Sequence, residues 1–196
     1  MAAFLALLRG INVGRAKRVA MADLRAVFAE RGFADAKTPL QSGNVVFTAP
    51  RALAVDEAAG LEAELLRRTG VQSSFLLLSA AEVRAIAEQN PLVALASDPS
   101  RLVVSFLSER PDPEQVQLPE AQGLAPEVLV LGERALYQWC PDGLMASRVP
   151  PAFWRQLAPA VVTARNWRTV VTLLALLDAT EGGANRDADG DGNRAP

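Results

Sequence analysis

The amino-acid sequence predicts an α+β fold made of two ferredoxin-like halves, each with the element order β-α-β-β-α-β, followed by a C-terminal helix. Short apolar runs of strand length alternate with stretches whose apolar residues recur at helical spacing. This order occurs twice along the chain and therefore indicates a duplication. The inference is based on the order of the elements, because the two halves show no clear sequence repeat. Half of the 196 residues are hydrophobic, so a sizeable core can be buried.

The first half is expected over residues 1–78. Four apolar runs predict its strands: residues 3–8, 36–40, 45–48 and 74–78. The first run is continuously apolar, as in a central strand, whereas Pro39 makes the second an edge strand because proline cannot donate to a sheet. Apolar residues at helical spacing predict two helices between the strands, which end at Gly32 and Gly70.

Residues 79–101 are expected to connect the two halves. Ser79 followed by Glu82 is the pattern of a capping box, in which each residue bonds the backbone N–H of the other. This pattern predicts a helix over residues 79–89, and the dipeptide Asn90-Pro91 ends it.

The second half, together with the final helix, is expected over residues 102–179. Four further runs predict its strands: residues 102–107, 127–131, 135–139 and 161–164. Its helices are expected at residues 111–121, 152–157 and 166–179. Residues 180–196 are rich in Gly, Asp, Asn and Arg, so we expect them to be disordered.

Composition excludes several classes of function. The 20 Lys and Arg and the 22 Asp and Glu give a net charge of −2, all of it within residues 180–196, so the neutral body predicts neither a nucleic-acid nor a membrane partner. The absence of His excludes a Ser-His-Asp triad and His-ligated zinc. Cys140 is the only Cys, so an internal disulfide is excluded. We expect no metal, no cofactor and a cytoplasmic location.

Two polar turns form the first candidate site. Residues 9–14 follow the first strand and residues 41–44 follow the second. The first two strands of a split β-α-β unit run in the same direction, so their C-terminal ends meet at one edge of the sheet. The residues expected to converge there are Arg9, Gly10, Asn12, Gly14, Gln41, Ser42 and Asn44.

The charge of this edge predicts an anionic ligand. Four basic residues come without a nearby acid: Arg9, Arg15, Lys17 and Arg18. Backbone N–H groups at glycine turns and helix starts also favour anions. We therefore expect a small pocket for a phosphate- or carboxylate-bearing ligand, in which Arg9 supplies charge and Ser42 and the two asparagines supply hydrogen bonds. The alternative is that these residues only cap a helix and close a hairpin.

Arg165, Asn166 and Arg168 form the second candidate site. Asn166 is a suitable N-cap for the final helix. Arg168 then lies in the first turn of that helix, where the helix dipole disfavours a cation. A bound anion would explain the arginine, and so would a carboxylate of the body that docks the helix; both interpretations stay open.

Other residues predict alternative functions. We interpret Cys140 as a structural thiol, because no His can activate it. Tyr137 and Trp139 alternate on one strand and suit either the core or the stacking of RNA bases. An enzyme acting on a phosphorylated or carboxylated metabolite would need a base such as Asp23 or Asp142. The alternatives to ligand binding are therefore such an enzyme and an RNA- or protein-interaction module.

The motifs of both candidate sites resemble those of the DUF1697 family, a group of bacterial proteins of unknown function. The resemblance rests on residues 7–14, 41–47 and 163–170, and extends from about residue 4 to residue 177. It implies an α+β fold with two ferredoxin-like halves and implies no established reaction. The signature positions carried over are Arg9, Gly10, Asn12, Gly14, Gln41, Ser42, Gly43, Asn44, Arg165, Asn166, Trp167 and Arg168.

Three positions depart from the pattern of that family. Pro39 stands where an aromatic residue is common, Arg15 where a glycine is frequent, and Arg148 where a lysine is usual. These departures concern the shape of the expected pocket and not the fold.

Overall fold

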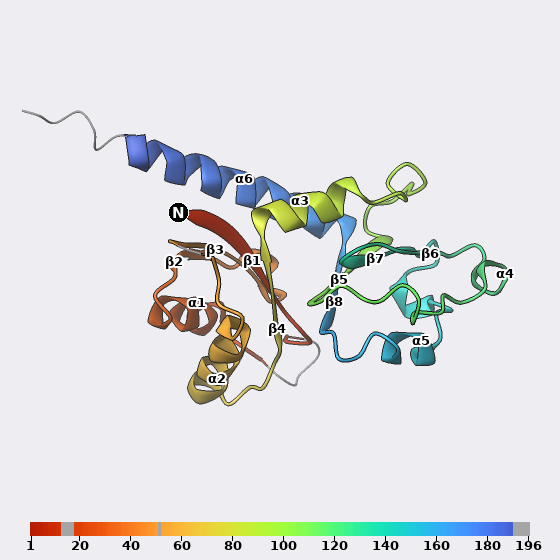
Figure 1. Ribbon diagram of the computed structural model, residues 1–196, viewed down its shortest axis with the longest axis horizontal. Coiled ribbons are helices and arrows are strands. Elements are labelled where there is room, and N and C mark those ends of the chain that lie inside the picture. Colours follow the sequence, from red (N-terminus) through yellow and green to blue (C-terminus); the bar gives the residue numbers. More distant parts are fainter. Residues whose placement is uncertain (13–17, 51, 190–196) are drawn as a thin grey trace, which may run out of the picture. The chain divides into compact units, whose positions relative to one another are not determined.

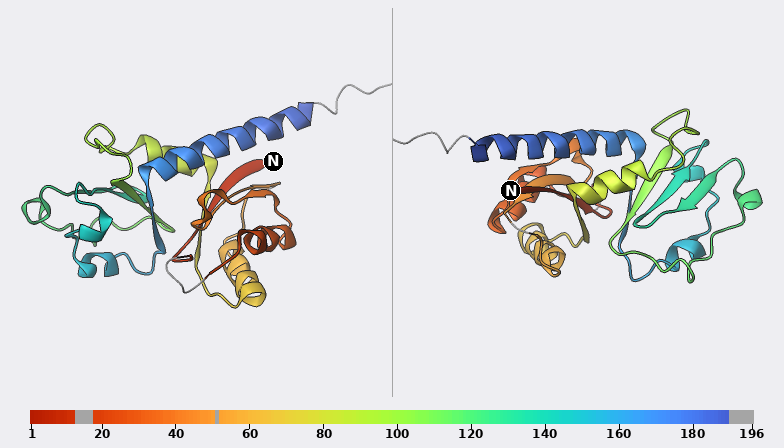
Figure 2. Two further views of the ribbon diagram at one scale, coloured as in Figure 1. Left: turned by 180° about the vertical axis from the view of Figure 1, so that it is seen from behind. Right: turned by 45° about the horizontal axis from the view of Figure 1, so that its top comes forward.

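The computed structural model describes residues 1–12, 18–50 and 52–189, and for residues 184–189 it describes the backbone alone. It contains two four-stranded antiparallel sheets with helices, which confirms the α+β class and the two similar halves (Figure 1). The chain divides into two compact units: Met1–Val83 with Leu173–Pro196, and Arg84–Thr172. Figure 2 shows each sheet from two further directions.

The first unit contains a sheet with the strand order β2-β3-β1-β4, in which every neighbouring pair is antiparallel. Its elements are β1 (Ala2–Leu8), α1 (Met21–Glu30), β2 (Ala34–Lys37), η1 (Pro39–Gln41), β3 (Asn44–Ala49), α2 (Glu57–Thr69) and β4 (Phe75–Ser79). As predicted, β1 is central and β2 lies at an edge. In the register of β1, Leu5 lies opposite Val46 of β3 and Leu78 of β4.

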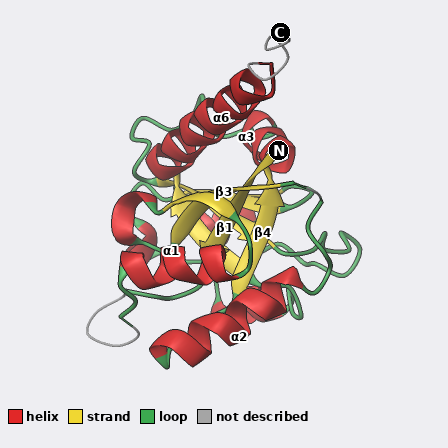
Figure 3. Cartoon of the chain, turned by 90° about the vertical axis from the view of Figure 1, so that its left-hand side faces the viewer, coloured by secondary structure: helices red, strands yellow, loops and turns green. Residues whose placement is uncertain are grey.

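Helices α1 and α2 cover one face of this sheet (Figure 3). Aromatic rings fill the space between helix and sheet. The ring of Phe28 in α1 lies 4.9 Å from that of Phe47 in β3, and the ring of Phe33 lies 4.8 Å from the same ring, measured between centroids. These separations are in the range of favourable aromatic pairs, so the rings fix how α1 sits on β3.

The second unit repeats the arrangement with the strand order β6-β7-β5-β8. Its elements are β5 (Leu102–Leu107), α4 (Ala121–Leu124), β6 (Val128–Leu131), β7 (Ala135–Trp139), η2 (Leu144–Ala146), α5 (Pro151–Arg155) and β8 (Val162–Asn166). The helix predicted over residues 111–121 was wrong, because only α4 forms in this region. Pro111, Pro113 and Pro119 explain the difference, since proline in a helix interior removes a hydrogen bond and clashes with the preceding turn.

Two further helices are α3 (Ala80–Glu88) and α6 (Trp167–Asp189). The capping box of α3 is confirmed: the Ser79 N–H donates to Glu82 Oε2 at 2.8 Å, and the Glu82 N–H donates to Ser79 Oγ at 3.2 Å. None of the helices in the described ranges has the length and apolarity to span a membrane.

Helix α6 extends ten residues beyond its predicted end at residue 179. The predicted disorder after this residue stays a prediction. Thr180 is buried, and its hydroxyl donates to the Leu176 carbonyl at 2.8 Å. The helix is therefore packed at the point where composition alone predicted its end. Residues 190–196 lie outside the described residues.

Candidate functional site

The two predicted turns meet at one end of the first sheet. Both β1 and β2 run antiparallel to β3, so their C-terminal ends lie on the same side. The Leu8 N–H donates to the Gly43 carbonyl at 2.8 Å. Asn12 Nδ2 donates to the Gln41 carbonyl at 3.0 Å. The predicted juxtaposition of the turns is therefore confirmed. Gly14, Arg15 and Lys17 lie outside the described residues.

Left-handed backbone conformations are concentrated in these two turns. The residues with positive φ are Gly10 (66°), Asn12 (57°), Leu40 (66°), Gln41 (43°) and Gly43 (74°). Such conformations cost side-chain-bearing residues about 1–3 kcal/mol each and persist only where the surroundings impose them. Tertiary contacts therefore hold Leu40 and Gln41 in this conformation, whereas Gly10, Asn12 and Gly43 are residue types that adopt it readily.

Asn12 and Asn44 use their side chains inside the turns. Asn12 Nδ2 also donates to the Val19 carbonyl at 3.2 Å, and Asn12 Oδ1 accepts the Val19 N–H at 3.0 Å. Asn44 is fully buried and donates to the Pro39 carbonyl at 3.3 Å and to Ser42 Oγ at 2.8 Å. Both amides therefore shape the turns, and their contact with a ligand stays a prediction.

The first of two clefts at this end is called here the Arg18 cleft. It has a volume of about 590 Å³ and is lined by Asn12, Arg18, Val19, Ala20, Met21 and Gln41. Arg18 is exposed and makes no ion pair with any carboxylate among the described residues. Ala20 and Met21 are the N-cap and the first residue of α1, and no side chain caps this helix start.

The second cleft, called here the Arg9 cleft, has a volume of about 450 Å³ and is lined by Arg9, Gly10, Glu62, Gln72, Ser73 and Ser74. Arg9 and Asn12, which were expected to share one pocket, thus line different clefts. Consecutive residues of a strand direct their backbone groups to opposite neighbours. The Leu8 N–H faces Gly43 beside β3, whereas the Arg9 N–H donates to the Ser74 carbonyl beside β4 at 3.0 Å.

The second candidate site belongs to the second unit. Asn166 is the predicted N-cap, because its Oδ1 accepts the Thr169 N–H at 2.9 Å. Arg168 Nη2 lies 3.8 Å from Asp98 Oδ1, and the Arg168 N–H donates to the Pro99 carbonyl at 3.3 Å. Hydrogen bonds from Ser100, with smaller contributions from Arg168 and Arg101, lower the pKa of the Asp98 carboxyl. The Asp98 carboxylate therefore lies beside Arg168. This is the arrangement expected if an ion pair docks the final helix.

Arg165 lies in β8 within the same unit. Its Nη1 donates to Thr163 Oγ1 at 3.0 Å and to the Ala164 carbonyl at 2.7 Å. Burial lowers the pKa of this guanidinium to about 10, because desolvation disfavours the charged form. Arg165 is thus positioned by its own strand, and ligand binding by Arg165, Asn166 and Arg168 stays a prediction.

The residues named for alternative functions are engaged elsewhere. Burial, with a smaller effect of Glu127, raises the pKa of the Cys140 thiol to about 12, which leaves it a poor nucleophile. Asp23 Oδ1 accepts a bond from Arg68 at 3.2 Å, and Asp142 belongs to the second unit. No carboxylate occurs among the described residues that line the Arg18 cleft. In the described ranges, no group of three Cys, Asp or Glu side chains could hold a metal ion.

The aromatic pair of β7 lies in the core. Tyr137 is 1% exposed and Trp139 is 8% exposed, so neither ring offers a face on which a base could stack. The Tyr137 hydroxyl donates to the Ile86 carbonyl at 2.7 Å, and burial raises its pKa to about 12. The core interpretation of these two residues is therefore confirmed.

The sequence indicated the charge of Arg18 but not its position beside a cleft. Val19, Ala20 and Met21, which line the same cleft, carried no signal of a site. The available signal was an arginine shortly before a helix whose N-cap residue, Ala20, has no capping side chain.

Comparison with known proteins identifies similar sequences and structures but no activity. A family model described as a protein of unknown function (DUF1697) matches residues 1–137. No curated protein matches the chain. The structure of the conserved bacterial protein SP0830 from Streptococcus pneumoniae is similar, with a TM-score of 0.67 and 27% sequence identity over 90% of this chain and 98% of that one.

Proposed function

The chain belongs to the DUF1697 family of proteins of unknown function, and on that premise we propose that it binds a small anionic ligand in the Arg18 cleft. The ligand is an organic molecule that bears a phosphate or carboxylate group. We also place the protein in the cytoplasm, on the basis of its cysteine content.

The observation that carries the proposal is a lone cation beside an open helix start. The first N–H groups of α1 have no side-chain cap, and Ala20 cannot provide one. These groups and the helix dipole favour a negative charge. Arg18 lines the same cleft without a carboxylate partner in the described ranges, so an anion would meet an unneutralised positive charge.

The size and lining of the cleft indicate more than a bare ion. A volume of about 590 Å³ lies within the range of small-molecule sites. Val19 and Met21 add apolar surface, whereas Gln41 is exposed and adds an amide. The organic part of a phosphorylated or carboxylated metabolite could therefore contact the apolar wall while its anionic group meets Arg18.

The proposal is tested by calorimetric titration of the wild-type chain with inorganic phosphate, glucose 6-phosphate, adenosine monophosphate and citrate. We expect at least one organic anion to bind, and Arg18→Gln to weaken its affinity by about ten- to a hundredfold, as for loss of a charged hydrogen bond. Arg155→Gln is the matched control, because Arg155 lines neither cleft and is likewise exposed and without an ion pair to any described residue.

Two results would contradict the proposal. One is the absence of binding by all four probes to folded wild-type protein. The other is equal affinity of the wild type and Arg18→Gln for a probe that does bind. The melting temperature of each variant shows whether it is folded before its affinity is compared. Turnover of a bound probe would instead support the enzyme alternative.

A further inference from the structure

The Arg9 cleft contains one positive and one negative side chain that do not neutralise each other. Arg9 and Glu62 both line this cleft of about 450 Å³. Neither forms an ion pair with an oppositely charged side chain anywhere in the described ranges, although each lies within reach of the same space. Both charges are therefore accessible to a third molecule.

A single segment, residues 73–75, fixes both of these residues. The Arg9 N–H donates to the Ser74 carbonyl at 3.0 Å, and Ser73 Oγ, of a buried serine, donates to the Arg9 carbonyl at 2.9 Å. The Phe75 N–H donates to Glu62 Oε1 at 2.9 Å. The backbone of Arg9 and one oxygen of Glu62 are thus held in place before any ligand arrives.

Such preorganisation matters for a small ligand. Ordering a long side chain on binding costs conformational entropy, and anchoring part of it beforehand reduces that cost. The remaining oxygen, Glu62 Oε2, has no hydrogen-bond donor among the described residues and is free to accept one. Gly10 adds no side chain, and a Cβ built on it would meet nothing within 4 Å, so the cleft is open at this point.

We infer that the Arg9 cleft binds a small zwitterion, whose carboxylate pairs with Arg9 and whose ammonium group pairs with Glu62. A free α-amino acid is the simplest molecule with this pair of groups. The opposite charges also provide selectivity, since Glu62 repels simple anions and Arg9 repels simple cations. This ligand class differs from that of the Arg18 cleft, and the inference does not depend on the function proposed for that cleft.

The experiment titrates the full chain with each of the twenty common L-amino acids and follows binding by calorimetry. For each amino acid that binds, the N-acetyl derivative removes the positive charge and the α-amide removes the negative charge. The variants are Arg9→Gln and Glu62→Gln, and Arg155→Gln is the control, because Arg155 is exposed and lines neither cleft. The amide oxygen introduced by Glu62→Gln can still accept the Phe75 N–H, so this variant should keep its fold, which its melting temperature verifies.

We expect at least one amino acid to bind, with affinity at least about tenfold lower in each of Arg9→Gln and Glu62→Gln and unchanged in Arg155→Gln. The N-acetyl derivative is a simple anion that lacks the ammonium group, so it should bind Glu62→Gln at least as tightly as the wild type, because this variant removes the repulsion by Glu62. The α-amide is a simple cation that lacks the carboxylate, so it should likewise bind Arg9→Gln at least as tightly as the wild type.

Three results would overturn the inference. The first is that no amino acid binds the folded wild type. The second is that both cleft variants bind as the wild type does. The third is that Glu62→Gln binds the amino acid more tightly than the wild type. The cleft would then recognise only the carboxylate of the ligand, and Glu62 would only repel it.

Discussion

Gly43 is the residue at which the two turns of the candidate site touch. Its φ is +74°, and a Cβ added to it would lie 2.9 Å from Leu8 Cβ and 3.0 Å from Ile11 Cγ1. Backbone conformation and space therefore both require glycine at this position. The Gln-Ser-Gly-Asn turn thus has a structural reason for its glycine that is independent of any ligand.

We expect Gly43→Ala to lower the free energy of unfolding by about 2–5 kcal/mol. A Cβ in the left-handed region costs about 1–2 kcal/mol, and overpacking adds about 1–3 kcal/mol. Gly70→Ala is the matched control, since Gly70 has a φ of +70° but nothing within 4 Å of an added Cβ. Gly70→Ala should therefore lose only the stability that the left-handed backbone conformation costs. Urea denaturation measures both values, and equal losses in the two variants would contradict the steric part of the argument.

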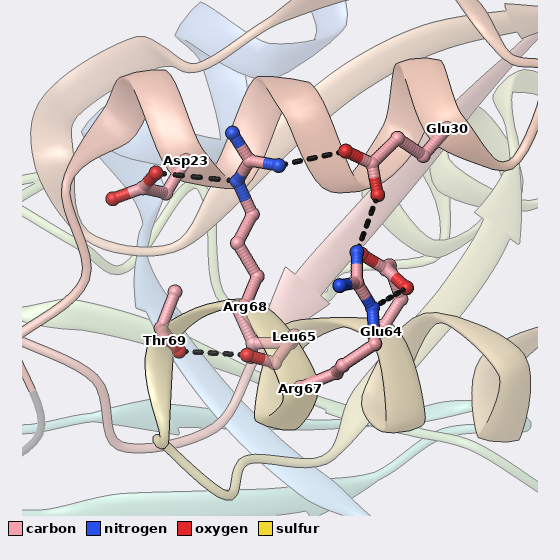
Figure 4. Close-up of polar contacts among 7 residues, drawn as sticks. All are labelled: Asp23, Glu30, Glu64, Leu65, Arg67, Arg68 and Thr69. Atoms are coloured by element: carbon pink, nitrogen blue, oxygen red, sulfur yellow. Dashed lines mark hydrogen bonds and ion pairs between the residues drawn. The ribbon is translucent and has the colours of Figure 1, made fainter.

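At the scale of elements, α1 and α2 are joined by a network of charged side chains (Figure 4). Arg67 contacts Glu64 at 2.6 Å and Glu30 at 2.9 Å. Arg68 contacts Glu30 at 2.7 Å and Asp23 at 3.2 Å. Isolated surface ion pairs contribute little, but here two arginines of α2 share one carboxylate of α1. The network therefore orients the two helices on the sheet more than it stabilises the fold.

The network should make stability depend on pH through Glu64. Its hydrogen bond with Arg67 lowers the pKa of the Glu64 carboxyl from 4.5 to about 2. The folded state therefore binds this proton less readily than the unfolded state. The resulting stabilisation is fully present above pH 4.5 and is lost as the pH falls towards 2.

Melting temperatures measured between pH 6 and pH 2 at low salt should test this effect. Glu64→Gln should lower the melting temperature at pH 6, and its difference from the wild type should shrink as the pH falls through about 4.5 to 2. Glu88→Gln replaces an exposed carboxylate that has no ion pair or side-chain hydrogen bond among the described residues. The melting temperature of this variant should change with pH as that of the wild type does. A constant difference between Glu64→Gln and the wild type would exclude Glu64 as the source.

At the scale of the whole molecule, the chain returns to its first unit after completing the second. The second unit ends at Thr172, and Leu173–Pro196 belong to the first. Leu173, Leu177 and Thr180 of α6 are all buried. A segment far from β1 in sequence therefore belongs to the same compact unit as β1.

Truncation should show how much of α6 is structural. We expect removal of residues 180–196 to lower the free energy of unfolding by about 1–3 kcal/mol, because it deletes a buried residue and the last turns of α6. Removal of residues 190–196 alone leaves α6 complete and should have no effect. Equal stability of the two truncated chains would contradict a structural role of residues 180–189 and support the expectation that they are disordered.

Local sequence patterns were sufficient for the order of the strands, for most of the helices and for several element ends, but not for the helix predicted over residues 111–121. The apolar run of β1, the capping box of Ser79 and Glu82, and the N-cap Asn166 are local patterns that lie within one turn or one strand. The meeting of the two polar turns also followed from the sequence, because the order β-α-β-β fixes the strand directions.

Only the tertiary structure decided where the polar side chains of that edge go. Arg9 and Asn12 are three residues apart, yet they line different clefts. The Arg9 N–H bonds to Ser74, which precedes β4, whereas the Asn12 amide bonds to Gln41, which precedes β3. Arg18 lies in one cleft with Gln41, which is distant in sequence, and Thr180 is buried beyond the predicted end of α6. Each of these depends on contacts between residues distant in sequence, which no local pattern of polarity or spacing encodes.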